Sequence, residues 1–353
     1  MAKKTKEENP ENKSKFQLTL EQLDKTYGKG TVLTLDSKTT GEYDVISSGS
    51  IGFDYITLGV GGFVKGKLYE LMGWEGACKS TVCGHAAAEC QKNGGKVLYV
   101  DGEFALDKKY FQSLGVDTTK LLISQPSTGE EGFNIIRDMI NTGELDLVII
   151  DSDSSLIPKA VIDGEVGDSS IGKKARLNNN AYPGIKSALV RNKTCVIVVS
   201  QYREKIGILF GNPTTTQGGH ALKFYTDCRI EISKSQAKDG DIVYGNITKV
   251  KATKNKMCSP YRVSKFEVVY GKGISKIAEI IELASEFELV KKYSKSITYN
   301  EVKYELETFK ILLQDNPELF DEIKQQIINK IKQTDDLPID ETSEEAELIN
   351  SQN

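Results

Sequence analysis

Gly73-Trp74-Glu75-Gly76-Ala77-Cys78-Lys79-Ser80-Thr81 is the most informative stretch of this sequence. It follows an apolar run, residues 67–72, that predicts a buried strand, and it leads into an Ala-rich segment, residues 81–92, that predicts a helix. Strand, tight loop and helix in this order are typical of a phosphate-binding loop, in which backbone N–H groups and a helix N-terminus surround the β- and γ-phosphates. Lys79 would add a positive charge, and Ser80 a hydroxyl ligand for Mg²⁺.

One residue departs from the pattern of such loops. Cys78 stands directly before the lysine, where glycine is usual because the backbone there needs a positive φ and approaches phosphate closely. A non-glycine residue in such a conformation costs on the order of 1–3 kcal/mol. The stretch alone therefore fits either a phosphate site or an ordinary strand-to-helix turn. A thiol beside Lys79 and a helix N-terminus is also expected to be reactive, and we hypothesise that oxidation or alkylation of Cys78 blocks nucleotide binding.

Length and composition limit the class of protein. With 353 residues, 39% of them hydrophobic, the chain can form one large domain and a smaller one. It contains no run of about 18 apolar residues that would predict a membrane span, and residues 1–7 lack the apolar segment of a secretory signal. Six cysteines without a CxxC pair predict reduced thiols in a cytoplasmic protein. With only two histidines, the sequence does not favour a zinc site.

Three further apolar segments each lead to a polar residue. Residues 96–101 precede Glu103, residues 145–150 precede Asp151, and residues 194–200 precede Gln201. Because α/β sheets bind their ligands at the carboxyl ends of parallel strands, we expect these residues to meet the phosphate loop there. Glu103 is suited to activating water, Asp151 to supporting Mg²⁺, and Gln201 to sensing the γ-phosphate. The alternative for Glu103 is a carboxylate that caps the next helix.

The segment after Gln201 shows neither helical nor alternating periodicity. Residues 202–220 place bulky apolar side chains among glycines, so we expect them to become ordered when a partner binds. A nucleic acid suits such a loop, because Ile206 can wedge between bases while Arg203 and Lys205 meet phosphates. Three glycines would offer further amide groups to phosphates: Gly207, Gly218 and Gly219. From these residues alone, a plain long hairpin is the better interpretation.

The two ends of the chain differ in character. Phe16, Leu20, Leu23 and Tyr27 recur at helical spacing before Gly28, which predicts an amphipathic helix that either caps the main domain or docks on a neighbouring subunit. After residue 276, periodic apolar residues predict helices of a second, smaller domain. Residues 335–347 form an acidic tail without Lys or Arg, which is typical of a solvated, disordered segment. If the chain binds DNA, this tail could compete with DNA for basic surface.

Four segments resemble the family of bacterial RecA recombinases. They are residues 102–107 (GEFALD), 163–169 (DGEVGDS), 205–213 (KIGILFGNP) and 218–225 (GGHALKFY). The similarity runs from about Phe16 to about Lys332, nearly the whole chain, and the match after Gln201 is highly specific. The resemblance implies ATP-dependent assembly of filaments on single-stranded DNA, homology search, and strand exchange with a duplex in DNA repair. A repressor protein that cleaves itself is a further implied partner.

The resemblance also implies roles for the nucleotide-site residues. It assigns Lys79, Ser80 and Thr81 to the triphosphate and its Mg²⁺, Glu103 to the attacking water, and Asp151 to support of the metal. Other implied contacts of the nucleotide are made by Asp107, Tyr110 and Tyr270. Gln201 would link the γ-phosphate to the loop that follows it. Two lysines, Lys254 and Lys256, would reach the ATP of the neighbouring subunit, so that sites are completed only in a filament.

For DNA, the resemblance implies two loops. The first is residues 165–172, with Ile171, Gly172 and the nearby Arg176, and the second is the loop after Gln201. Residues 178–184 depart from the family, which has a basic helix there, and Pro183 removes a backbone donor and favours a kink. We expect one phosphate contact to be lost at this point, and Lys173 and Lys174 to compensate. These departures, with Cys78, suit a phage-encoded or diverged member.

The sequence therefore predicts an α/β fold of the RecA type with a mostly parallel central sheet. The expected parts are an N-terminal oligomerisation element (residues 1–40), an ATPase core with both DNA loops (41–275), a small α/β domain (276–333) and the acidic tail (334–353). Two other functions remain open. One is a single-strand DNA-coating protein whose ATP hydrolysis is impaired by Cys78, and the other is a P-loop regulatory ATPase that does not act on DNA.

Overall fold

The computed structural model describes residues 14–28, 31–32, 43–165, 172–204, 214–216, 221–334 and 337–340. The chain divides into two compact units, Met1–Tyr43 and Asp44–Asn353. The first contains α1 (Lys15–Tyr27), which ends at Gly28 as its spacing predicts. Ser14 and Gln17 form a capping box at its start. None of the side chains of α1 is buried, and the Phe16 and Tyr27 rings are exposed.

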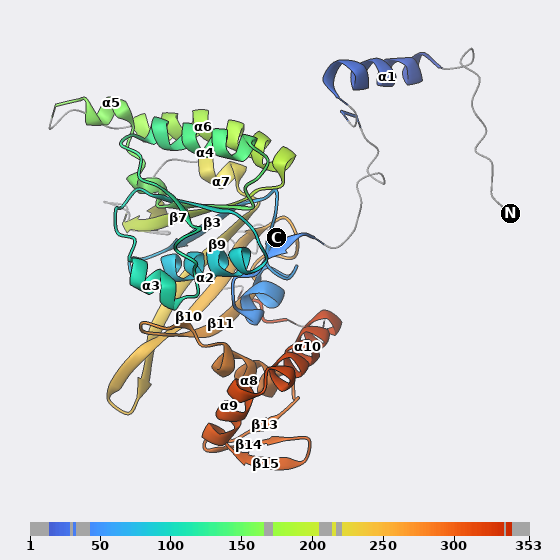
Figure 1. Ribbon diagram of the computed structural model, residues 1–353, viewed down its shortest axis with the longest axis vertical. Coiled ribbons are helices and arrows are strands. Elements are labelled where there is room, and N and C mark those ends of the chain that lie inside the picture. The colour runs from blue at the N-terminus through green and yellow to red at the C-terminus, as the bar shows by residue number, and fades with distance from the viewer. Residues whose placement is uncertain are drawn as a thin grey trace, which may run out of the picture. The chain divides into compact units, whose positions relative to one another are not determined.

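Ten strands among the described residues of the second unit form one mixed sheet (Figure 1). The order across the sheet is β12-β11-β10-β9-β3-β7-β6-β4-β5, and β8 pairs with β7. Neighbours from β9 to β5 are parallel, and the other pairs are antiparallel. The bounds are β3 (Leu68–Gly73), β4 (Val97–Asp101), β5 (Leu122–Ser124), β6 (Leu147–Asp151), β7 (Cys195–Glu204), β8 (Thr214–Thr216), β9 (Cys228–Asp239), β10 (Ile242–Asn255), β11 (Val263–Val269) and β12 (Gly273–Ile274).

Helices cover both faces of this sheet, which makes three layers (Figure 1). On one face lie α2 (Lys79–Lys92) and α3 (Lys108–Ser113), and on the other α4 (Gly129–Asn141), α6 (Lys173–Asn192) and α7 (Ala221–Tyr225). Successive strand residues point to opposite faces, so Tyr99 packs with the α2 cluster, whereas Val100 packs with the α4 and α6 cluster. Burial on both faces explains why the parallel strands are apolar throughout.

Several shorter elements lie before or between these strands and helices in the sequence. They are β1 (Val45–Ile46), which pairs with β2 (Phe63–Val64), and the short helices η3 (Gly52–Thr57), η4 (Asp153–Ser155) and α5 (Lys159–Ile162). Helix α2 begins at Lys79, two residues before the predicted start, because Cys78 is its N-cap. Among the described residues, no helix is long and apolar enough to cross a membrane.

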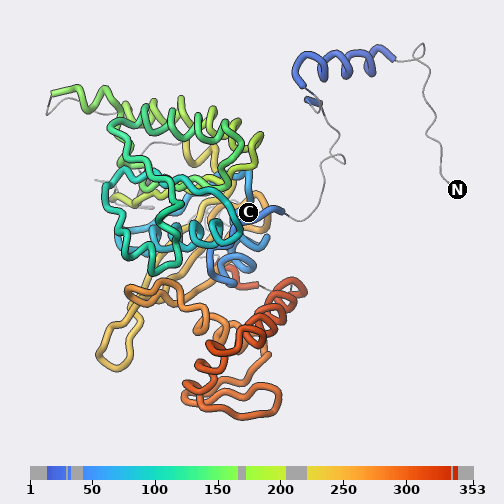
Figure 2. The backbone as a smooth tube through the Cα atoms, viewed as in Figure 1, coloured from blue at the N-terminus to red at the C-terminus, as the bar shows by residue number. Residues whose placement is uncertain are grey.

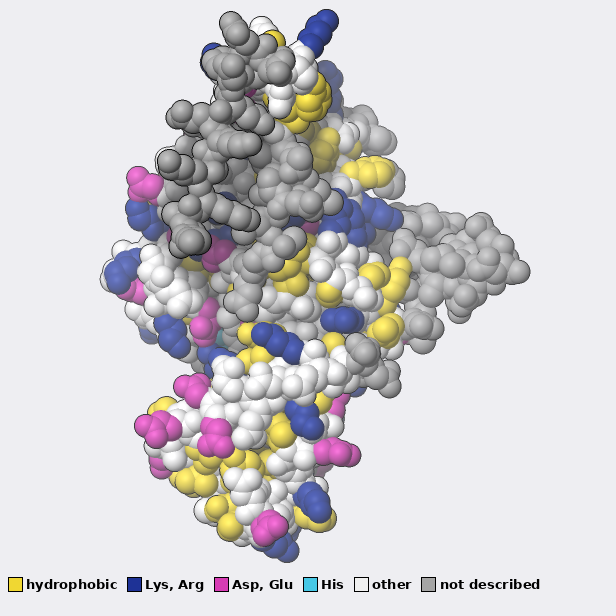
Figure 3. Space-filling view, turned by 90° about the vertical axis from the view of Figure 1, so that its right-hand side faces the viewer, with side chains coloured by type: hydrophobic (Ala, Val, Ile, Leu, Met, Phe, Trp, Pro, Cys, Tyr) yellow, Lys and Arg dark blue, Asp and Glu magenta, His cyan; other side chains and the backbone are white. Residues whose placement is uncertain are grey.

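Residues 276–333 form a lobe below the sheet (Figure 2). It contains α8 (Lys276–Glu286), β13 (Lys291–Lys292), β14 (Ser296–Tyr299), β15 (Val302–Glu305), α9 (Leu306–Asp315) and α10 (Pro317–Gln333). Its apolar cluster also includes Ile51 and Ile56 of the main domain. Acidic and basic side chains are interspersed on the face of this lobe in Figure 3, which fits a solvated surface. The α/β fold is thus confirmed, while the domain boundary at residue 276 stays a prediction.

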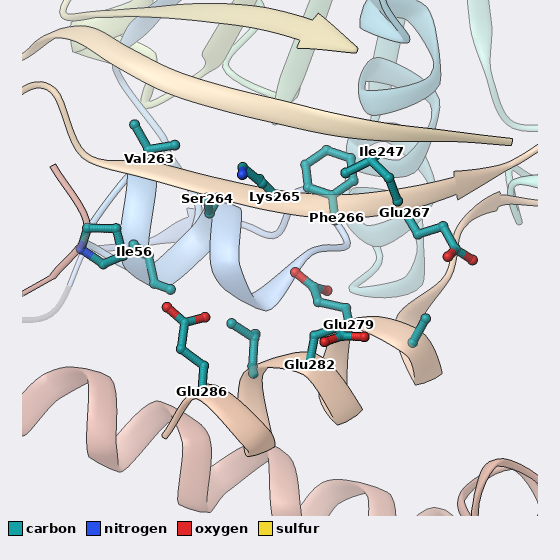
Figure 4. A pocket seen from close by; sticks show the side chains of 13 residues that line it. Ile56, Ile247, Val263, Ser264, Lys265, Phe266, Glu267, Glu279, Glu282 and Glu286 are labelled. Atoms are coloured by element: carbon teal, nitrogen blue, oxygen red, sulfur yellow. The ribbon is translucent and has the colours of Figure 1, made fainter. Parts of the chain in front are cut away.

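A groove of about 470 Å³ lies between β11 and α8 (Figure 4). Glu279, Glu282 and Glu286 line it from α8. The Glu279 side chain is buried and accepts hydrogen bonds from the Ile51 and Gly52 backbone N–H groups at the start of η3. This carboxylate therefore joins the C-terminal lobe to the main domain. The groove shares no lining residue with the cleft at the predicted phosphate loop.

A second buried carboxyl, Asp54, lies in η3 at the same junction. It accepts hydrogen bonds from the Ser47 hydroxyl (2.6 Å) and from the Ser48 backbone N–H (2.9 Å). Burial raises the pKa of Asp54 to about 7, against the hydrogen bonds, and the nearby Glu279 charge adds to the rise. The protonated form is therefore favoured in the folded chain well above the pH at which an unfolded chain ionises.

We expect this carboxyl to make the fold less stable as pH rises from about 4 to about 7. Over that interval the unfolded state loses a proton that the folded state retains, so the contribution of Asp54 falls and is lost above its folded pKa. Asp54→Asn cannot ionise. The free energy of unfolding of this variant, relative to the natural protein, should therefore improve with pH, by at most about 4 kcal/mol. Urea unfolding at about pH 4.5 and about pH 7.5 measures the change.

The matched control is Asp138→Asn, because the Asp138 side chain is 68% exposed. Its difference from the natural protein should change with pH by less than that of Asp54→Asn. A difference for Asp54→Asn that changes no more than that of the control would contradict the raised pKa.

Candidate nucleotide-binding site

The carboxyl ends of β3, β4, β6 and β7 meet at a cleft of about 380 Å³. Gly73 pairs with Gln201 across β3 and β7, and Asp101 pairs with Asp151 across β4 and β6. The parallel register therefore brings the predicted groups to one edge of the sheet. The predicted residues that line the cleft are Glu75, Gly76, Ala77, Cys78, Lys79, Ser80, Thr81, Glu103, Tyr110, Asp151, Gln201 and Tyr270.

Cys78 has the backbone conformation that glycine usually supplies. Its φ is 65° and its ψ is 19°, in the left-handed region, and the nearby Gly76 also has a positive φ of 67°. The loop therefore keeps a glycine-like shape although Cys78 carries a Cβ atom. The thiol is half-buried, lines the cleft, and receives a long contact of 3.6 Å from Nδ2 of Asn246. Its reactivity stays a prediction.

Lys79 is held inside the loop. The side chain is 6% exposed, and Nζ donates to the carbonyl oxygens of Gly73 (2.9 Å) and Trp74 (2.7 Å). Burial lowers the pKa of Lys79, and the charges of Asp151 and Glu103 oppose this shift. An ammonium held by two carbonyls beside a cleft can exchange them for phosphate oxygens, to which its hydrogen bonds are stronger.

Ser80 and Asp151 meet across the cleft. The Ser80 hydroxyl donates to Oδ2 of Asp151 at 2.6 Å, and the Tyr99 hydroxyl donates to the same oxygen at 2.6 Å. Burial raises the pKa of Asp151, and both hydrogen bonds oppose that rise. One hydroxyl and one carboxylate suit Mg²⁺, which takes few protein ligands beside water and phosphate. Within the described residues, no cluster of three or more His, Cys, Asp or Glu could hold a metal.

Glu103 lies at the same edge, and two neighbours orient it. Its Oε1 accepts hydrogen bonds from the Ser152 hydroxyl (2.6 Å) and from Nε2 of Gln201 (2.8 Å). The alternative that Glu103 caps the next helix is wrong, because Asp107 caps α3 by accepting from the backbone N–H groups of Lys109 and Tyr110. The contact of Asp107 with a nucleotide base stays a prediction.

The other side of the cleft combines three predicted residues with two that the sequence did not indicate, Asn246 and Lys234. The Tyr110 and Thr81 hydroxyls share a hydrogen bond of 2.7 Å, and the Tyr270 hydroxyl donates to Asn246 at 3.4 Å. Asn246 and Lys234 line the cleft from β10 and β9. Neither belongs to a local motif. The position of Lys234 follows from the parallel pairing of β9 with β3, and that of Asn246 from the antiparallel pairing of β10 with β9.

Part of the predicted DNA interface lies within the described residues. Arg203 is exposed on β7, Gly172 has φ 76° as the N-cap of α6, and Arg176 is exposed on that helix. The Trp74 ring of the phosphate loop meets the Tyr202 ring edge-on, with centroids 6.0 Å apart. The predicted residues outside the described part of the chain are Ile171, Lys205, Ile206, Gly207, Gly218 and Gly219.

The expected hairpin after Gln201 is present in part. Thr214–Thr216 pair with residues 202–204 in antiparallel register. Lys254 donates to the Lys223 carbonyl (2.8 Å), and Lys256 lies 3.9 Å from Asp227. Neither lysine lines the cleft of its own chain. Their role toward a neighbouring subunit stays a prediction.

Helix α6 corrects one interpretation of the sequence. The helix continues through Pro183, and Asn178 is buried, where its Nδ2 donates to Asp153. Lys174 is also engaged, because its Nζ donates to the Leu156 carbonyl at 2.8 Å. Asn178 therefore belongs to the interior of the fold, and Lys174 is engaged by a backbone carbonyl. The loss of a phosphate contact at residues 178–184 and its compensation by Lys173 and Lys174 stay predictions.

Comparisons with known proteins agree with this geometry. The family model of the RecA N-terminal domain matches residues 14–275. The chain is 44% identical to protein RecA of Cytophaga hutchinsonii over 338 residues, which cover 94% of this chain and 95% of that one. It is 42% identical to protein RecA of Porphyromonas gingivalis (90% and 94% covered) and to that of Bacillus thuringiensis (87% and 90% covered).

We expect Cys78→Gly to raise the free energy of unfolding by about 1 kcal/mol, since glycine relieves the strain of the positive φ but gives the unfolded chain more freedom. Urea denaturation measures the change. Cys78→Ala is the matched control, because it removes the thiol and keeps the Cβ atom. If the Gly variant is no more stable than the Ala variant, the loop is not strained at this residue.

Proposed function

The chain belongs to the RecA family of homologous-recombination proteins, and we propose that it uses ATP to assemble on single-stranded DNA and to exchange strands with a homologous duplex. The observation that carries this proposal is the cleft where Lys79, Ser80, Glu103, Asp151 and Gln201 meet. We also propose a cytoplasmic location, in which the six free cysteines would stay reduced.

In this proposal the phosphate loop binds the triphosphate of ATP. Amide groups of the loop and of the α2 N-terminus would face the β- and γ-phosphates, and Lys79 would add its charge. Ser80 and Asp151 would hold Mg²⁺, which supplies positive charge to the phosphate oxygens. The glycine-like conformation of Cys78 supports nucleotide binding over the alternative of a protein that only coats DNA.

Glu103 is proposed as the general base for hydrolysis. Its carboxylate is already oriented by Ser152 and Gln201, so one oxygen is held while the other can accept a proton from water. Gln201 contacts Glu103 and lies on the strand that leads into the proposed second DNA loop. A change at the γ-phosphate would therefore reach that loop through one side chain.

Self-association is proposed from two exposed apolar features. Helix α1 presents the Phe16 and Tyr27 rings to solvent. Leu122 and Ile123 are exposed on β5, which is the last strand at one side of the described sheet. Exposed apolar side chains and an unpaired edge favour pairing between copies. In such an assembly Lys254 and Lys256 would approach the ATP of a neighbour.

We expect single-stranded DNA to stimulate ATP hydrolysis by the natural protein. Glu103→Gln should lower the stimulated rate by about 10²–10⁴-fold, because the amide cannot accept the proton of water. Its ATP affinity should be retained. Phosphate release with and without DNA, together with equilibrium nucleotide binding, measures both effects.

Glu144→Gln is the control, because Glu144 is exposed and pairs with Lys96 away from the cleft. Hydrolysis that DNA does not change would favour the P-loop regulatory ATPase. DNA binding that ignores ATP, without turnover, would favour the coating protein.

Two residues near the C-terminus, Ile339 and Asp340, lie beside basic residues that could otherwise contact DNA. Ile339 pairs with Arg262 beside β11, and the Asp340 carboxylate lies 2.6 Å from Lys249 Nζ and 3.5 Å from Lys251 Nζ on β10. The first described acidic residue of the predicted tail thus neutralises two lysines. We propose that it competes with DNA phosphates for this basic surface.

Asp340→Asn should therefore raise DNA affinity by about two- to tenfold at low salt, and the gain should vanish at high salt, where screening weakens both contacts. Fluorescence anisotropy with labelled DNA at two salt concentrations measures it. Asp138→Asn removes one acidic charge elsewhere on the surface. Equal gains in both variants would show that only net charge matters.

A further inference from the structure

Helix α6 is tied to the end of β6 by a buried polar cluster. Its centre is the Asp153 carboxylate, whose side chain is 1% exposed. Oδ1 accepts the Tyr182 hydroxyl at 2.6 Å, and Nδ2 of Asn178 reaches both carboxylate oxygens, at 3.0 and 3.2 Å. Lys174 Nζ lies 3.6 Å from the same carboxylate. Each partner of Asp153 in this cluster comes from α6.

The three partners fix the rotation of α6 about its axis and its position along that axis. Lys174, Asn178 and Tyr182 follow one another at intervals of four residues, so they form a single stripe along α6. The Tyr182 ring also meets the Phe133 ring of α4 edge-on, with centroids 5.4 Å apart. A slip of α6 by one turn would separate Asp153 from its donors, and a buried carboxylate without donors is costly.

The same carboxylate stands beside the nucleotide cleft. Asp153 follows Asp151 by two residues, and the residue between them, Ser152, donates its hydroxyl to Glu103. Asp151 in turn holds the Ser80 hydroxyl. The segment that carries the proposed metal and water contacts is therefore continuous with the segment that holds α6.

At its other end, the cluster includes the first turn of α6. Lys174 is the second residue of α6, and Gly172, the N-cap, is the last residue of the proposed first DNA loop. The structure thus links the nucleotide cleft to the start of α6 through Ser152, Asp153 and Lys174.

We propose that Asp153 is a positioning residue: by holding Lys174, Asn178 and Tyr182, it sets the start of α6, with the predicted DNA contacts Gly172 and Arg176, relative to the nucleotide cleft, so that binding of nucleotide and of DNA favour each other. This inference rests on the proposed function, since it needs both ligands. The proposed coupling runs through Asp153 and α6. It is separate from coupling through Gln201, which lies on β7 before the second DNA loop.

The test is the effect of nucleotide on DNA affinity. Dissociation constants for labelled single-stranded DNA are measured with and without a non-hydrolysable ATP analogue and Mg²⁺. In Asp153→Asn we expect the enhancement by nucleotide to fall about tenfold, and in Tyr182→Phe to fall by a smaller factor, since only one donor is lost. The effect of DNA on nucleotide affinity must fall by the same factor, because linkage is reciprocal. A merely structural defect would weaken the single affinities and leave the enhancement at the value of the natural protein.

Tyr299→Phe is the matched control, because it removes a buried tyrosine hydroxyl that donates to Glu322 in the C-terminal lobe. Its enhancement should equal that of the natural protein. Tyr182→Phe keeps the ring against Phe133, so it carries the test if Asp153→Asn does not fold.

Two negative outcomes are distinguishable. If the natural protein shows the enhancement and folded Tyr182→Phe and Asp153→Asn retain it in full, the inference is wrong and the proposed function stands. If the natural protein binds DNA without any response to nucleotide, the proposed function fails and this inference fails with it.

Discussion

The parallel register of β3, β7, β6 and β4 is the constraint on which the site depends. These strands are buried on both faces, and their backbone pairing sets Gly73 beside Gln201 and Asp101 beside Asp151. Groups far apart in the sequence therefore converge before any side chain bonds to another. The hydrogen bonds from Ser80 to Asp151 and from Gln201 to Glu103 follow from that convergence. If one strand shifted its register by one residue, the polar side chains at its carboxyl end would point to the opposite face of the sheet. They would then no longer line the cleft.

Packing of the flanking strand and helix also explains how the phosphate loop accommodates Cys78. Helix α2 packs against the sheet through Val82, Cys83 and Ala86, which are fully buried. Burial of such side chains contributes about 1 to 3 kcal/mol each, and together they outweigh one strained backbone residue, which costs on the order of 1–3 kcal/mol. The strand on one side and the helix on the other thus impose the φ of Cys78. Packing sets the loop conformation here, and the residue in the loop adds only a local penalty.

The limits of sequence reasoning follow from where each residue finds its partners. Ser80, Glu103 and Asp151 could be predicted, because each directly follows a long apolar strand or belongs to a local motif. Lys234 and Asn246 could not, since strands late in the chain, β9 beside β3 and β10 beside β9, bring them to the cleft. The partner of Asn178 is Asp153, 25 residues earlier, and nothing in the sequence indicates this pair. A polar residue in a helix gives no sign of its face until the opposing carboxylate is known, and Asp153 has no motif of its own.

The two proposed DNA loops are connected to the nucleotide cleft in different ways. This difference determines which substitutions each loop can tolerate. The proposed second DNA loop continues directly from β7, so its link to Gln201 is covalent and survives most side-chain changes. Helix α6, which begins after the proposed first loop, is held both by apolar packing in the cluster it shares with α4 and by the Asp153 carboxylate. A buried carboxylate tolerates far fewer arrangements, since each lost donor leaves charge unsatisfied. Asp153 therefore limits α6 to one register, and we expect substitutions on the inner face of α6 to shift the start of that helix while the covalent link of the second loop stays intact.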